Sequence, residues 1–281
     1  MNKHSILETS FKKAMGGGLS GAVAMTTQVS TLMWLRTTVN YQYRYGGSTI
    51  NTIKLLYKEG GIPRFYRGIM PALMQGSLAR FGDTAANTGI MYYMNNNEHT
   101  KNLPIGVKTS MCSGGASLWR VFIMPVDTFK TSMQVNGKNG ISILKNKVNT
   151  NGYRILYNGS GAAMSATYVG HFPWFLTYNY LNERYPPKTN TLQNLIRNGA
   201  IGFSASVVSD TCSNSLRIIK TNKQTHKTNI SYKNVIENII KKDGLISLFT
   251  RGLKTKIISN GIQGSLFAIT WKYFENKFSV I

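Results

Sequence analysis

The sequence predicts an all-α membrane protein in which six tilted transmembrane helices form three pseudo-symmetric repeats, with short helices between them. Three observations predict this fold. An aromatic-centred turn ending in glycine recurs at Gly68, Gly159 and Gly252, at intervals of 91 and 93 residues. Long spans that are almost free of charge recur at the same period, and strongly basic loops separate them. Because each unit is too small to bury its faces alone, we expect one domain over residues 1–281.

The nearly uncharged spans have about the length needed to cross hydrocarbon, ~20 residues. Residues 16–35, 159–182 and 257–271 contain no Asp, Glu, Lys or Arg, and three further spans contain one or two. They are rich in Gly, Ala, Ser and Thr, which allow close contact between membrane helices. The predicted helices cover residues 11–39, 69–97, 107–136, 160–184, 195–223 and 253–277, and the repeats cover 11–98, 107–186 and 195–279.

Short amphipathic helices are expected over residues 48–58, 140–148 and 231–242. In the last of these, apolar residues recur at near-helical spacing, at Val235, Ile239 and Ile240. Each short helix lies in a basic segment of the chain. These segments therefore predict a layer of short helices at one end of the bundle.

The charge distribution favours a membrane topology. The net charge is +23, and most of it lies in residues 36–67, 130–154 and 217–256, which carry six, five and ten Lys or Arg against one, no and two acids. Basic loops on one side are typical of membrane proteins, and six crossings put both termini on the other side. Basic residues that cluster by chance in a soluble protein would hardly do so three times at the period of the repeated glycines. A nucleic-acid partner would explain the charge but not the uncharged spans.

Several function classes lack their motifs. The chain has no phosphate-binding glycine loop, no metal-ligand cluster and no nucleophile–base spacing, so we expect neither an enzyme nor a metal site. Cys112 and Cys212 have no metal or disulfide spacing and are interpreted as packing residues. Residues 1–15 lack the apolar stretch of a secretory signal.

The motifs in the second repeat identify a family. Pro125-Val-Asp127-Thr-Phe-Lys130 ends a small-residue helix, a basic loop follows, and an aromatic turn with Gly159 opens the next span. With its echoes in the other repeats, the whole chain resembles the mitochondrial carrier family. The resemblance implies a monomeric six-helix bundle, with its short helices on the matrix side, that spans the mitochondrial inner membrane several times. It also implies solute exchange (antiport) by alternating access around a central cavity.

The resemblance implies a gate at the matrix end. Pro125 removes a backbone donor and kinks its helix, so that Asp127 and Lys130 can reach neighbouring helices. In the family three such charge pairs close a ring, and the alignment pairs Asp127 with Lys220. The gate candidates here are Asp127, Lys130, Arg217 and Lys220.

The other repeats depart from this pattern. An alignment on Gly17, Gly18 and Gly21 places the proline, acid and base positions of the first repeat at Ser30, Leu32 and Leu35, and those of the third are Ser215, Arg217 and Lys220. One acid then faces several bases, and Lys130 and Arg217 have no family-type partner. We expect a weak gate, or one that needs an anion to close.

The opposite gate is equally incomplete. The family's charged motif would fall 20 and 23 residues after each repeated glycine. Those positions are Thr88 and Met91, Asn179 and Asn182, and Lys272 and Glu275. Lys272 and Glu275 form the one charged pair, in reversed order, and are retained as gate candidates.

The central site lies seven and eight residues after each repeated glycine, about two helical turns along the cavity wall. With the ionisable residues at membrane depth, which are functional candidates by default, the substrate-binding candidates are Gln75, Gly76, Arg80, Asp83, Arg120, Ala166, Thr167, His171, Ser259 and Asn260. Three alternatives stay open: an ion pair between Arg80 and Asp83 within one helix, Arg120 as a tether between helices, and His171 as a packed histidine.

Three helix starts near basic side chains suit an anionic lipid phosphate, and the resemblance implies cardiolipin. The alternative is ordinary helix capping. The candidate residues are Gly61, Arg67, Gly68, Gly152, Gly159, Gly244, Arg251 and Gly252.

Two functions are considered. The first is an inner-membrane carrier for a small anionic metabolite, a nucleotide or a carboxylate. The second is a carrier fold retained as a structural subunit or assembly partner of a larger respiratory complex, which the missing gate charges favour. Apart from bound cardiolipin, no cofactor is expected.

Overall fold

Helices make up nearly all of the chain that the computed structural model describes, which is residues 8–9, 12, 28–187 and 190–263. Residues 28–45 and 253–263 are helical. Between them lie α2 (Thr49–Phe65), α3 (Ile69–Asn96), α4 (Ile105–Phe122), α5 (Met124–Asn136), α6 (Gly140–Asn151), α7 (Ser160–Arg184), α8 (Thr191–Thr225), α9 (Tyr232–Asp243) and α10 (Ser247–Thr250). Two 3₁₀ turns, η1 (Gly137–Asn139) and η2 (Tyr153–Tyr157), flank α6.

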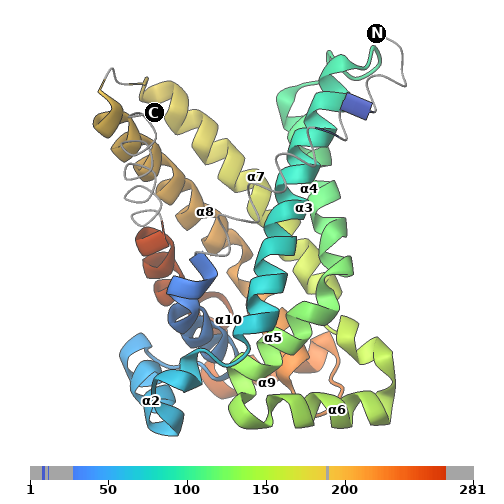
Figure 1. Ribbon diagram of the computed structural model, residues 1–281, viewed down its shortest axis with the longest axis vertical. Helices are drawn as coiled ribbons and strands as arrows, with labels where there is room; N and C mark the ends of the chain where they lie inside the picture. The colour runs from blue at the N-terminus through green and yellow to red at the C-terminus, as the bar shows by residue number, and fades with distance from the viewer. Residues whose placement is uncertain (1–7, 10–11, 13–27, 188–189, 264–281) are drawn as a thin grey trace, which may run out of the picture.

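The long helices form two arms. In Figure 1, α3 and α4 run along one side and α7 and α8 along the other. The two arms diverge toward one end and approach each other at the end where α2, α6 and α9 lie. Helix α4 packs against α3 and α7, and α7 packs against α8. The predicted layer of short helices at one end therefore agrees with the structure.

One predicted helix is two helices. Residues 107–136 were expected to form a single kinked helix, but the chain breaks between α4 and α5 at Ile123. Pro125 stands in the first turn of α5, where its missing N–H is not needed. Helix α8 has Ser215 at the corresponding position and runs unbroken for 35 residues. The break thus follows the proline rather than the repeat.

Within the described residues, no helix combines the length and the apolar character needed to cross a membrane.

Three glycines join the repeats in a closed cycle. Gly68, Gly159 and Gly252 have left-handed φ angles of 81°, 87° and 68°, which glycine adopts without steric cost. At each one, an added Cβ would lie 3.1–3.3 Å from a backbone carbonyl oxygen of a neighbouring helix. Those oxygens belong, in the same order, to Lys130 of α5, Lys220 of α8 and Val39 of the 28–45 helix.

This cycle corrects the alignment of the first repeat. The Val39 carbonyl faces its repeated glycine as the carbonyls of Lys130 and Lys220 face theirs. Val39 therefore stands at the base position of the first repeat, and Arg36, three residues earlier, stands at the acid position. A parallel contact supports this: Thr37 donates to the Phe65 carbonyl at 2.6 Å, as Thr128 does to Leu156 at 2.7 Å. The expected positions Ser30, Leu32 and Leu35 are therefore wrong. The alignment used the early glycines, which lie outside the described residues.

Buried cations also link the repeats. Arg64, at the end of α2, donates to the carbonyls of Gln134 and Val135 at the end of α5. Lys147 of α6 donates to the Gln224 carbonyl at the end of α8, over 3.0 Å. Cations stabilise the carbonyl end of a helix. Each contact holds the short-helix segment of one repeat against the next repeat.

Candidate functional site

A central cavity of about 360 Å³ lies between the long helices. Its wall takes residues from the 28–45 and 253–263 helices and from α3, α4, α5, α7 and α8. All ten predicted substrate-binding residues line it, as do four predicted gate residues: Gln75, Gly76, Arg80, Asp83, Arg120, Ala166, Thr167, His171, Ser259, Asn260, Asp127, Lys130, Arg217 and Lys220. The spacing from the repeated glycines thus located the cavity wall, although ligand binding itself stays a prediction.

An ion pair spans three helices on one side of the cavity. The Arg120 Nη2 atom lies 2.9 and 2.7 Å from the two carboxylate oxygens of Asp83, and Arg120 Nε donates to Thr167 Oγ1 at 3.1 Å. Arg120 of α4 therefore tethers α3 and α7, as one of the alternatives expected. The intrahelical pair of Arg80 and Asp83 does not form, because Asp83 faces Arg120 instead.

Arg80 remains available on the cavity wall. Its side chain is exposed, and no carboxylate in the described part of the chain pairs with its guanidinium. His171 lies on the same wall and meets Phe175 edge to face, with ring centroids 6.3 Å apart. Arg80 is thus a cation that a solute can reach without displacing an acid of the described chain.

Asp127 belongs to the part of the cavity wall that we call the floor, which comprises Asp127, Lys130, Arg217 and Lys220. Its Oδ1 atom lies 2.8 Å from Lys130 Nζ, and its Oδ2 atom lies 2.5 Å from Lys220 Nζ. Gln224 donates to the same Oδ2 at 2.9 Å, and Lys130 also donates to Gln75 at 2.9 Å. The pairing of Asp127 with Lys220 is confirmed, and it joins α5 to α8. Lys130 pairs with Asp127 on its own helix and with no acid of another described helix, so a family-type partner on a neighbouring helix is not seen for it.

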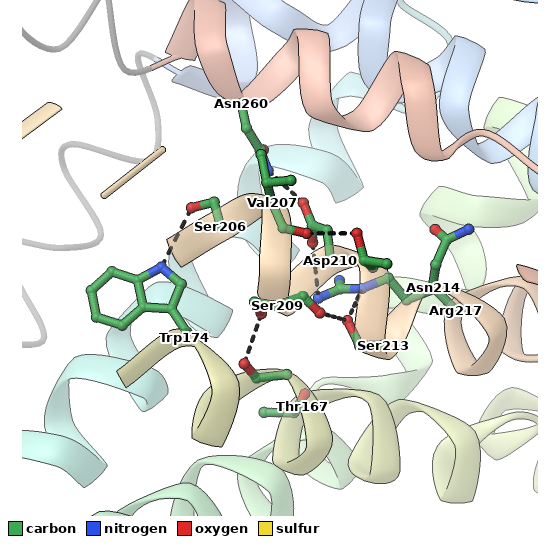
Figure 2. A network of polar contacts seen from close by, with 12 residues as sticks. Thr167, Trp174, Ser206, Val207, Ser209, Asp210, Ser213, Asn214, Arg217 and Asn260 are labelled. Carbon is green, nitrogen blue, oxygen red and sulfur yellow. Dashed lines mark hydrogen bonds and ion pairs between the residues drawn. The ribbon is translucent and has the colours of Figure 1, made fainter. Parts of the chain in front are cut away.

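Arg217 also has a partner that the sequence comparison did not provide. Figure 2 shows Asp210, two helical turns before it on α8, turned toward the Arg217 guanidinium. The closest N–O distance is 3.6 Å. Ser213 accepts from Arg217 Nε at 3.2 Å, and Asn260 donates to Asp210. Asp210 appeared in the sequence only as the single charge of its span, and its distance of seven residues from Arg217, two helical turns, was the signal that could have found it.

The cavity carries an excess of positive charge. Its acids are Asp83, Asp127 and Asp210, whereas its cations are Arg36, Arg80, Arg120, Lys130, Arg217, Lys220 and Lys256. Sequence reasoning missed Lys256, and it misplaced Arg36 because of the alignment. Asp127 lies 32 residues before Gly159, and Arg36 lies 32 residues before Gly68. Counting back from the repeated glycine would therefore have found Arg36. The described residues contain no cluster of acids, histidines or cysteines able to hold a metal ion.

The opposite gate has no charged residues in α3 or α7. Thr88 and Met91 lie in α3, and Asn179 and Asn182 lie in α7. Asn182 accepts from Arg197 of α8 through both its backbone and side-chain oxygens, at 2.9 and 2.8 Å. Lys272 and Glu275 fall outside the described residues.

The predicted lipid residues lie at the short-helix end. Gly61, Gly152 and Gly244 have left-handed φ angles of 63°, 74° and 81°. A second hollow, of about 830 Å³, includes Arg251 and Gly252 in its lining. The Arg251 guanidinium is buried, and it pairs with Asp243 and donates to Ser247 at 2.8 Å. Arg251 is thus already held by the protein.

Comparisons with known proteins agree with the repeat. The family profile described as "Mitochondrial carrier protein" matches residues 8–97, 102–189 and 192–280. PET8 of Saccharomyces cerevisiae, described as a mitochondrial carrier protein, is 29% identical over 164 residues, which cover 53% of each chain. A mitochondrial carrier-like protein of Acanthamoeba polyphaga mimivirus is 24% identical over 168 residues, 59% of this chain and 65% of that protein. These alignments span about half to two thirds of the relatives' length.

Proposed function

The chain belongs to the mitochondrial carrier family, whose members are transporters rather than enzymes, and on that premise we propose that it carries a small anionic solute, a nucleotide or a carboxylate. The observation that supports the proposal most is the cavity, which holds seven cations against three acids. A basic cavity with low-dielectric walls concentrates anions. The proposed location is the mitochondrial inner membrane, with the short-helix end toward the matrix.

The contacts suggest how the solute is held. Arg80 is the first cation for it, because no acid of the described chain pairs with its guanidinium. Thr167 and Asn260 line the same cavity with neutral polar groups. The wall of small residues at Gly76 and Ala166 leaves room for the solute between the two arms.

Alternating access then requires the floor to open. Asp127 holds α5 and α8 together through Lys220, and the solute would leave only when that contact separates. Few cross-helix charge pairs hold this floor, so it should open easily. Solute exchange, or antiport, is the mode we propose, with cardiolipin bound near the glycines of the short-helix end.

The test is uptake of labelled nucleotides and carboxylates by liposomes that contain the purified protein. Arg80→Gln should lower anion uptake at least tenfold. Arg184→Gln removes the same charge from an exposed site at the end of α7, and it should leave uptake unchanged. If the unaltered protein exchanged no anion, the transport proposal would be wrong.

One observation favours a second function. The acid positions of the first and third repeats hold Arg36 and Arg217 instead of acids. Among the described gate residues, the cross-helix charge pair is therefore that of Asp127 with Lys220. A bundle that serves as a structural subunit or assembly partner of a respiratory complex needs no breakable gate. A blue-native gel that shows the protein in a large complex would support this role, and migration as a monomer alone would count against it.

A further inference from the structure

The last turn of α8 gathers basic side chains from all three repeats. Arg44, near the end of the 28–45 helix, donates through Nη1 to Asn222 Oδ1 at 2.9 Å. Lys147 of α6, at the end where the short helices lie (Figure 1), donates to the Gln224 carbonyl at 3.0 Å. Two further bases belong to the end of α8 itself. We call the four residues the basic cluster, which consists of Arg44, Lys147, Lys223 and His226.

The members of the basic cluster lie close enough to act on one another. The charges of Arg44 and Lys223 act on Lys147, and those of Arg44 and Lys147 act on His226. Lys147 is buried and the other three are half-buried, so water weakens their repulsion only in part. Burial, followed by the charge of Arg44, holds the pKa of His226 below that of an ordinary histidine. At pH 7 the cluster therefore holds three positive charges and a neutral imidazole.

These charges are not neutralised within the part of the chain that the structure describes. None of its acids forms an ion pair with the basic cluster. Asp243, at the same end of the bundle, pairs with Arg251. Lys223 Nζ donates to the neutral Ile230 carbonyl at 2.7 Å. The carbonyl end of α8 supplies only about half a negative elementary charge, so most of the positive charge is left without a counter-charge.

Arg44 shows that an acceptor is missing here. Its Nε atom is buried and has no hydrogen-bond partner among the described residues, whereas a buried donor is normally paired. The guanidinium lies over the Tyr45 ring, 5.6 Å from the centroid, and its Nη1 atom is used by Asn222. An unpaired buried donor costs free energy. The site that surrounds Arg44 is therefore short of both negative charge and acceptors.

We propose that the basic cluster binds a phosphate-type oxyanion at the short-helix end, and that Arg44, Lys147 and Lys223 hold it between the three repeats. A phosphate group offers several acceptor oxygens to one guanidinium fork and two ammonium groups, and the planar fork of arginine favours such contacts. A monovalent ion would leave more of the charge unmatched. The anion is either free phosphate or the phosphate of a nucleotide.

The site goes beyond the proposed transport, since a bundle that carries nothing would still bind the anion. Lys223 lies three residues after the floor residue Lys220 on α8, and α6 follows α5 in the chain. The anion would therefore hold together the same two repeats that Asp127 and Lys220 join in the floor. Its binding should stabilise the bundle with a closed floor by mass action.

The experiment is a thermal-shift titration of the full-length protein in detergent with inorganic phosphate, at ionic strength held constant with sodium chloride. We expect a saturable rise in the unfolding temperature. Arg44→Gln, Lys147→Met and Lys223→Met should each weaken the apparent Kd for phosphate at least tenfold, whereas Lys223→Arg, which retains the charge, should change it less than threefold. Each variant is compared with its own phosphate-free baseline, so a general loss of stability does not mimic the result.

Two exposed residues provide controls of equal charge change. Lys145→Met on α6 matches Lys147→Met, and Arg154→Gln in η2 matches Arg44→Gln; both should leave the Kd for phosphate unchanged. If the controls weakened binding as much as the cluster variants, only net charge would matter and the site would be refuted. Cluster variants that bind phosphate as tightly as the original protein would refute it as well.

A second arm separates the two sources of phosphate. A shift with inorganic phosphate supports a free ion, and a shift only with a nucleoside diphosphate, lost in Lys147→Met, supports the phosphate of a nucleotide. A shift that Arg80→Gln abolishes and Lys147→Met leaves intact would come from the central cavity and would overturn the proposal, as would no shift with either compound. Because the measurement is of binding, a failure to transport would leave this result unaffected.

Discussion

At the residue scale, Lys147 is a buried base outside the long helices. Its side chain is 4% exposed and donates to the Gln224 carbonyl. Burial, and to a lesser extent the charges of Arg44 and Lys223, lower the pKa of Lys147 to about 8. An ordinary lysine titrates near 10.5. The folded protein therefore releases this proton at a lower pH than the unfolded chain does.

This difference predicts how stability depends on pH. Below about pH 8 Lys147 is charged in both states and its burial cost is fully present. Between about 8 and 10.5 the unfolded chain binds more protons, so stability rises with pH. Lys147→Met should remove that rise, which thermal unfolding in detergent across this range measures. Lys145→Met, on the exposed face of the same helix, should retain it.

Asp127 is the second residue whose charge has a large effect. Asp127→Asn would leave Lys130 and Lys220 without their carboxylate inside the cavity floor. Loss of one partner of a buried ion pair costs about 3–5 kcal/mol. We expect a clearly lower unfolding temperature, and we expect the triple variant that also carries Lys130→Met and Lys220→Met to recover part of it. An Asp127→Asn protein as stable as the original would show that the floor charges are fully hydrated.

At the element scale, the repeated glycines determine where α3, α7 and the 253–263 helix begin. Gly68 has a φ of 81°, and an added Cβ would lie 3.0 Å from the Cβ of Met133. Gly68→Ala should therefore destabilise the protein by about 1–2 kcal/mol from backbone conformation alone. Gly199→Ala in α8 is the control, because no atom lies within 4 Å of its added Cβ. Equal unfolding temperatures for the two variants would contradict this role of Gly68.

The boundaries of elements show what local sequence can decide. Helices α3 and α7 begin and end within one residue of their predicted limits, because a glycine turn and a long uncharged span mark them. Helix α8 begins at Thr191, four residues before its predicted start, with Asn190 as a cap that accepts from the N–H groups of Leu192 and Gln193. An asparagine cap is a local signal too, but the chain contains many asparagines that could cap a helix, so the sequence does not single out Asn190.

At the scale of the whole molecule, the buried cations make the repeats interdependent. Arg64 is 1% exposed and contacts the carbonyls of Gln134 and Val135 as well as Glu59. Hydrogen bonds to charged groups contribute about 1.5–3 kcal/mol each. Arg64→Met should therefore lower the stability of the entire bundle, and not only that of the first repeat.

Two readouts test this interdependence. Tryptophan fluorescence and limited proteolysis of the third repeat should report the same lowered unfolding temperature in Arg64→Met. Lys54→Met, on the exposed side of α2, should change neither. Independent unfolding of the first repeat would show that the cation contacts do not couple the repeats.

The candidate site was predicted in part. Positions counted from the repeated glycines reached the cavity, since a helix rises by a constant amount per residue and its register therefore follows from one fixed point. The partners of the charged residues were predicted less well. An ion pair of Asp83 with Arg80 on the same helix was one open alternative, but Asp83 faces Arg120 instead, because the choice between two nearby guanidinium groups depends on how α3 and α4 pack.

The sequence by itself determined the helical class, the three units and the cavity wall, because glycine turns, charge patterns and helical periodicity are local properties of the chain. Apart from the pairing of Asp127 with Lys220, which the family resemblance predicted, only the tertiary structure decided which charges meet. The contacts of Asp83 with Arg120 and of Asp210 with Asn260 join segments that are far apart in the chain. Electrostatic pairing depends on distances through space, and no local pattern contains those distances.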